Sequence, residues 1–102
     1  MNAINVNSEN FSSFIDTEKP VLLDFYAEWC GPCRTVLPIM DEIARERSDI
    51  AVGKINVGVE SELASLFGVT SIPTLVVLKD KKIVNQSTGA KPKAKILDLV
   101  KN

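Results

Sequence analysis

The chain lacks histidine altogether and has only two cysteines among its 102 residues. Two cysteines are too few for the disulfide framework that holds many small secreted domains together. A structural zinc site takes four protein ligands, usually Cys or His. With two cysteines and no histidine, this chain would bind zinc only at a site shared between two molecules. Because a disulfide framework and a zinc site within one chain are both excluded, the function depends on what Cys30 and Cys33 do as a pair.

The sequence also has no surplus of charge of one sign and no long apolar run. Twelve Lys and Arg residues against thirteen Asp and Glu residues give a net charge of −1, so no electrostatic signal indicates binding to nucleic acid or to a lipid surface. No apolar stretch is long enough to cross a membrane. Residues 1–7 have neither the basic start nor the apolar stretch of a secretory signal, so we expect a cytoplasmic protein.

Hydrophobic periodicity predicts a single α/β domain that spans residues 1–102. Strands are expected over residues 4–6, 21–27, 50–57, 74–78 and 82–87. Helices are expected from a cap at Asn7 or Ser8 to before Pro20, over 30–48, over 60–67 and from Pro92 onward. Strand–helix–strand runs come first and a hairpin turn at Asp80-Lys81 comes later, so we predict a central mixed five-stranded sheet flanked by four helices.

Two of these elements contain positions with a specific expectation. The strand over 21–27 is almost continuously apolar, as is typical of a strand covered on both faces, and only Asp24 interrupts it. In the helix over 60–67 we expect Leu63, Leu66 and Phe67 to point inward, with Gly68 as a left-handed residue after its end.

The cysteines stand in the segment Trp29-Cys30-Gly31-Pro32-Cys33, where a helix is expected to begin. Side chains three apart on a helix lie one above the other, which puts the two α-carbons near the separation of a disulfide. The free N–H groups at a helix start favour a thiolate, so Cys30 is expected to be the exposed nucleophile and Cys33 the buried resolving thiol. Pro32 fixes the backbone of the first turn, and Gly31 leaves space above the sulfurs.

Simpler interpretations of these residues stay open at this point. The pair could be a structural disulfide, although closing a four-residue loop would contribute only about 2 kcal/mol. Asp24 is costly to ionise inside an apolar strand, which raises its pKa toward neutral, and it is either a proton carrier or a satisfied structural carboxylate. Lys54 is either a neighbour of that acid or a lysine whose ammonium reaches water.

The segment from Phe25 to Cys33 resembles the active-site segment of the thioredoxin family. The resemblance extends over essentially the whole chain and includes Asp24, Pro38, Lys54, Ile72-Pro73-Thr74 and Gly89. It implies a thioredoxin fold and a thiol–disulfide oxidoreductase that reduces protein disulfides through Cys30 and Cys33. The Gly-Pro dipeptide between the cysteines resembles the reducing branch of the family.

The same resemblance implies roles for the remaining site residues. Asp24 would exchange a proton with Cys33. The cysteine pair would be modulated by Lys54, Gly31 and Pro32, and the peptide bond before Pro73 would be cis. A surface facing the substrate would be formed by Trp29, Gly31, Pro32, Ile72, Pro73, Thr88, Gly89 and Ala90. The Cys30–Cys33 disulfide would be the only redox group, with no bound cofactor and no metal.

For partners, the resemblance implies a flavoprotein thioredoxin reductase as electron donor. Clients would include ribonucleotide reductase, peroxiredoxin and methionine sulfoxide reductase, and the protein would be a monomer. Departures from the common pattern occur at Tyr26, Gly58, Lys81 and Thr88, none of which is expected to touch the sulfurs. Two other functions fit the same fold: an oxidase or isomerase with a more oxidising couple, and a non-enzymatic subunit that uses only the surface.

Overall fold

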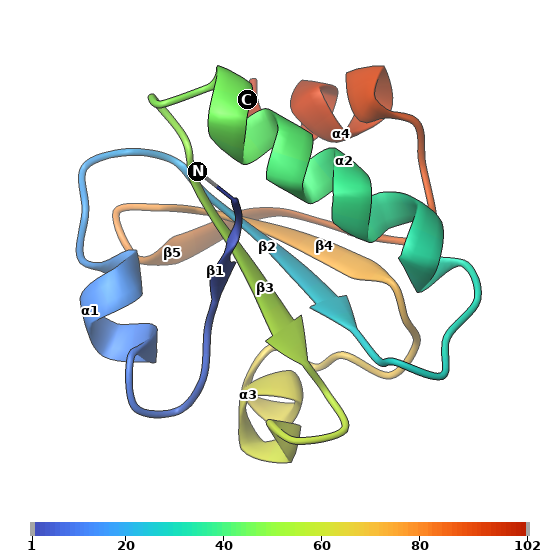
Figure 1. Cartoon of the computed structure of the whole chain (residues 1–102). Helices are drawn as coiled ribbons and strands as arrows, with labels where there is room; N and C mark the ends of the chain where they lie inside the picture. Colours follow the sequence, from blue (N-terminus) through green and yellow to red (C-terminus); the bar gives the residue numbers. More distant parts are fainter. Residues whose placement is uncertain (1, 102) are drawn as a thin grey trace.

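A mixed five-stranded sheet separates two pairs of helices in the computed structural model, which describes residues 2–101 (Figure 1). The elements in chain order are β1 (Ile4–Asn5), α1 (Phe11–Ile15), β2 (Val21–Tyr26), α2 (Cys33–Glu46), β3 (Ala51–Asn56), α3 (Ser61–Leu66), β4 (Thr74–Lys79), β5 (Lys82–Thr88) and α4 (Lys93–Val100). The strand order is β1-β3-β2-β4-β5, with β1, β3 and β2 parallel and β4 and β5 antiparallel. The predicted α/β architecture is confirmed.

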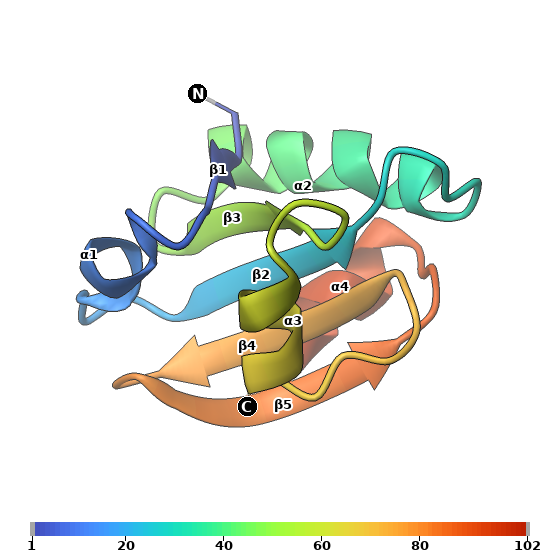
Figure 2. The ribbon, with the colours of Figure 1, turned by 90° about the horizontal axis from the view of Figure 1, so that it is seen from below.

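Strand β2 lies in the centre of the sheet, and its side chains contribute to the hydrophobic core on each face of the sheet. Leu22 packs with residues of α2 and α4, whereas Leu23 and Phe25 pack with residues of α1 and α3. Figure 2 shows α3 in front of the strands and α4 behind them. Because successive side chains of a strand point to opposite faces, Asp24 lies on the same face as Leu22, under α2. The apolar run of this strand is therefore explained by burial on both sides.

Helix α2 begins three residues later than the sequence predicted. Cys30, Gly31 and Pro32 form a turn before it, in which the Cys30 N–H donates to the Ala27 carbonyl at 3.2 Å. Pro32 is the residue before the first helical position, and Cys33 is the first. Pro38 lies inside the helix at an exposed position, where its missing N–H removes one helical hydrogen bond.

The expectation that Leu66 points inward is wrong. Leu66 is 66% exposed, whereas Leu63 and Phe67 are buried. The buried stripe of α3 also contains Ala64, and at 3.6 residues per turn Leu66 lies about 60° beyond Leu63, outside that stripe. The expected left-handed residue after the helix is confirmed, since Gly68 has φ 65°.

Helix α1 is shorter than predicted, because it covers only Phe11–Ile15 and its N-cap is Asn10 rather than Asn7 or Ser8. Asn7 instead stabilises the turn before the helix, where its Oδ1 accepts from the N–H groups of Glu9 and Asn10. In the hairpin, Asp80 and Lys81 have φ 53° and 66°. Two consecutive positive φ values match the twist of the flanking strands and are unfavourable for lysine.

Gly53 is required where the side chains of Val6 and Phe14 pack against β3. A Cβ there would lie 2.7 Å from Val6 Cγ2 and 2.9 Å from Phe14 Cζ. We expect Gly53→Ala to lower the free energy of unfolding by about 1–3 kcal/mol, as overpacked cores do. Urea unfolding measures this, with Gly58→Ala as the control because a Cβ there meets only the Asn56 side chain. Equal losses in the two variants would contradict the crowding at Gly53.

Candidate active site

The two cysteines form a disulfide where α2 begins. Their α-carbons lie 5.4 Å apart, as the spacing predicted. The Cys33 backbone N–H donates to Cys30 Sγ at 3.2 Å, so an N–H group of the helix start points at the sulfur nearer the surface. In the reduced protein the same N–H would stabilise negative charge on Cys30.

The two sulfurs are unequally covered, but less so than predicted. Cys33 is 0% exposed and Cys30 is 6% exposed, so Cys30 is mostly covered rather than an exposed side chain. The residues next to Cys30 are the exposed ones: Trp29 is 77% exposed, and Gly31 and Pro32 also lie at the surface. A partner therefore reaches Cys30 across a rim formed by the other residues of the motif.

A loop from the opposite side of the sheet completes the site. The Ile72-Pro73 bond is cis, and the Ile72 carbonyl oxygen lies 4.0 Å from Cys30 Sγ. The Gly89 N–H donates to the Pro73 carbonyl at 2.8 Å, and Gly89 has φ 102°, which favours glycine. Thr88 Oγ1 lies 3.4 Å from Thr74 Oγ1. The loop before β4 and the end of β5 are thus brought together beside the sulfur, with exposed Ala90 next in the chain.

Asp24 is a fully buried acid on the α2 face of the sheet. Neither of its oxygens has a hydrogen-bond partner within residues 2–101. Burial raises the pKa of Asp24 from 3.8 to about 7, and the positive charge of Lys54 opposes this effect. Asp24 and Lys54 are neighbours in the register of β2 and β3. The acid can therefore gain or lose a proton near neutral pH.

Two further residues, one beside Lys54 and one beside the cysteine pair, were missed or misjudged from the sequence. Lys54 Nζ lies 3.9 Å from Asp41 Oδ1 on α2, a contact that no local pattern indicates. Tyr26 packs against the buried cluster of Ala27, Cys30 and Cys33, closer to the pair than expected. Burial raises the pKa of Tyr26, with smaller contributions from Glu28 and Asp24. Asp41 falls with the polar residues of the helical pattern, so nothing local indicated its contact with Lys54.

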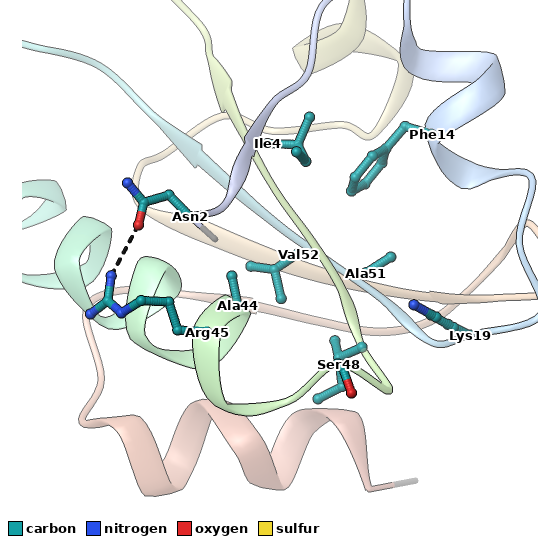
Figure 3. Close-up of a pocket in the computed structure, with 10 residues that line it drawn as sticks. Asn2, Ile4, Phe14, Lys19, Ala44, Arg45, Ser48, Ala51 and Val52 are labelled. Atoms are coloured by element: carbon teal, nitrogen blue, oxygen red, sulfur yellow. Dashed lines mark hydrogen bonds between the residues drawn. The ribbon is translucent and has the colours of Figure 1, made fainter.

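A separate hollow of about 360 Å³ lies at the other end of β3 (Figure 3). It is formed where the N-terminal segment, α1 and the end of α2 meet, and Arg45 Nη1 donates there to Asn2 Oδ1 at 3.0 Å. None of the predicted site residues lines it. Within residues 2–101, no cluster of three or more His, Cys, Asp or Glu side chains could hold a metal ion, and no helix is long and apolar enough to span a membrane.

A redox disulfide at the first turn of a helix, facing a cis-proline loop, defines a thiol–disulfide oxidoreductase. A family model described as Thioredoxin matches residues 2–102. The chain is 43% identical to a thioredoxin of Chlamydia caviae over 95 residues, 93% of this chain and 92% of the relative. It is 46% identical to a thioredoxin of Mycobacterium bovis over 96 residues, 92% and 83% of the two chains.

A mutant thioredoxin from Halobacterium salinarum has the same fold. The TM-score is 0.90 at 35% identity, over 97% of this chain and 88% of that one. The chain belongs to the thioredoxin family and is a protein-disulfide reductase. The family as a whole works with a thioredoxin reductase and with disulfide-containing client proteins.

Proposed function

We propose that Cys30 attacks the disulfide of a client protein and that Cys33 then resolves the complex. The observation that supports this order is the Cys33 N–H directed at Cys30 Sγ, 3.2 Å away. Since a thiolate and not a thiol attacks a disulfide, the sulfur that receives a helix N–H is the better nucleophile. Complete burial of Cys33 protects it from direct reaction with solvent oxidants or with a second client.

The reaction proceeds in two exchanges. In the first, the Cys30 thiolate bonds to one client sulfur, the client S–S bond breaks, and the other client sulfur leaves as a thiolate that takes up a proton. In the second, Cys33 loses its proton and attacks Cys30 Sγ, and the second client sulfur leaves. Two electrons pass to the client, and the Cys30–Cys33 disulfide is the product. A thioredoxin reductase returns both electrons.

Asp24 accepts the proton of Cys33 in the second exchange. A carboxyl group with a pKa of about 7 is ionised in half of the molecules at that pH, so it serves as acceptor in this direction and as donor in the reverse one. The absence of histidine leaves the chain without the usual base of neutral pH. Lys54 modulates this acid through its charge.

Clients bind to the surface around Cys30 that is formed by Trp29, Gly31, Pro32, Ile72, Pro73, Thr88, Gly89 and Ala90. Exposed Trp29 supplies apolar contact and the backbone at Ile72 supplies main-chain hydrogen bonds, so recognition depends little on client side chains. The clients we propose are ribonucleotide reductase, peroxiredoxin and methionine sulfoxide reductase. The protein acts as a cytoplasmic monomer with one domain over residues 1–102, without a bound cofactor.

Cys33→Ser is expected to stop the reaction after the first exchange. The serine hydroxyl cannot resolve the mixed disulfide, so the reduced variant incubated with oxidised insulin should accumulate a covalent complex through Cys30. Intact-mass spectrometry with and without dithiothreitol measures it. The wild-type protein is the matched control and should show almost no complex. An equal amount of adduct in a Cys30→Ser protein would contradict the assigned roles.

The electron donor is tested separately from the exchange chemistry. This protein should accelerate the reduction of insulin by dithiothreitol. That assay needs no reductase, because dithiothreitol itself supplies the electrons. Repeating the assay with NADPH and candidate thioredoxin reductases in place of dithiothreitol then identifies the donor. A protein that accelerates neither reaction would overturn the proposed function.

A further inference from the structure

Lys54 lies between two carboxylates from different elements. It neighbours Asp24 in the register of β2 and β3, and its Nζ lies 3.9 Å from Asp41 Oδ1 on α2. Both Asp24 oxygens lack a hydrogen-bond partner within residues 2–101. The cation beside the buried acid in the sheet is therefore directed at a different carboxylate.

Asp41 is itself fixed by a second contact. Its Oδ1 accepts the Ala3 N–H at 3.0 Å, so α2 is tied at this point to the segment before β1 as well as to β3. The side chains of Lys54 and Asp41 are only 20% and 23% exposed. A pair with so little exposure is less screened by water and salt than one at the surface.

We propose that Asp41 is a positioning residue that holds the Lys54 ammonium away from Asp24 and so leaves the buried acid unpaired and able to exchange a proton. This inference rests on the proposed role of Asp24 toward Cys33. An opposite charge brought within about 4–6 Å of a carboxyl group favours its ionised form and lowers its pKa by about 1–3. Pairing with Lys54 would thus take Asp24 out of the neutral range in which it can both accept and release a proton.

The surroundings of Asp24 contain few other groups that could change its protonation. Within residues 2–101, Lys54 on β3 and Tyr26 on β2 interact electrostatically with Asp24. Helix α2, which covers this face of the sheet, carries Cys33 and Asp41, and Asp41 contacts Lys54. The β4 neighbour in the register is Leu75, which carries no charge. Cys33 does not titrate in the disulfide form and the pKa of Tyr26 is raised, so among residues 2–101 Lys54 is the charge that acts on Asp24 near neutral pH, and Asp41 contacts that lysine.

Asp41→Asn tests the inference because asparagine keeps an oxygen for the Ala3 N–H and removes only the charge. We expect the titration midpoint of the Asp24 carboxyl carbon, followed by NMR in the oxidised protein, to fall by about 1 pH unit as Lys54 pairs with Asp24. In a Lys54→Gln background the same substitution should move the midpoint by less than about a third of that, since only the direct field of Asp41 is then lost. Non-additivity between the two substitutions is the decisive readout.

Glu42→Gln is the matched control, because Glu42 is the next residue of α2 and pairs with Lys93 at 2.6 Å. It should leave the Asp24 midpoint unchanged. Equal shifts by Asp41→Asn in both backgrounds, an upward shift or no shift would overturn the inference. The NMR titration needs no client, so it stands apart from catalysis. A shifted midpoint with an unchanged pH profile of insulin reduction would support the positioning of Lys54 and refute the proposed role of Asp24.

Discussion

Cys30→Ser is expected to lower the rate of client disulfide reduction by a factor on the order of 10³ or more, because no other group can form the mixed disulfide. Cys33 is fully buried beneath Cys30 and cannot replace it. The serine is close in size to the cysteine, so the fold should be kept. Initial rates of insulin reduction with a saturating thioredoxin reductase measure the loss.

The control for this prediction is the circular dichroism spectrum and urea midpoint of the variant, compared with those of the reduced wild-type protein. Both should agree closely, since the reduced wild type also lacks the disulfide. A Cys30→Ser protein that kept more than about a tenth of the wild-type rate would show that Cys33 can attack clients, and would overturn the order of the two exchanges.

The stability of the protein is expected to fall as the pH rises from about 4 to about 7, because of Asp24. Its pKa is 3.8 in the unfolded chain and about 7 in the folded one, so the folded state holds a proton that the unfolded state releases in this range. The contribution is fully present below the unfolded pKa and is lost as the pH passes the folded one. The loss from this group amounts to about 4 kcal/mol.

Asp24→Asn isolates this contribution. The variant should show a much weaker decrease in the free energy of unfolding between pH 5 and pH 8, and should be more stable than the wild type above pH 8 by about 2–4 kcal/mol. Urea unfolding of the oxidised proteins at a series of pH values gives both quantities. Asp49→Asn is the control, since Asp49 pairs with Arg47 at the surface and its pKa is lowered. If the free energy of unfolding of Asp24→Asn decreased with pH as steeply as that of the wild type, Asp24 would not be protonated in the folded state.

Local sequence spacing was sufficient for the strands and for the cysteine pair. The apolar run of β2 predicts a strand buried on both faces, because burial of alternate side chains needs no knowledge of what covers them. Cysteines three apart before an amphipathic helix predict a disulfide at a helix start, because helical geometry fixes their separation within one turn. The resemblance of the motif then gave the family, which the comparisons confirm.

Tertiary packing decided what local spacing could not. The exposure of Leu66 depends on which face of α3 meets the sheet, and the cover over Cys30 depends on Ile72, which is 42 residues away in the chain. Asp41 contacts Lys54 only because α2 packs across β3. The sequence by itself determined that two cysteines pair at the start of a helix and that one acid lies inside a buried strand. The contacts between distant segments decided how far Cys30 is covered and which carboxylate contacts Lys54, since only packing fixes distances between residues far apart in the chain.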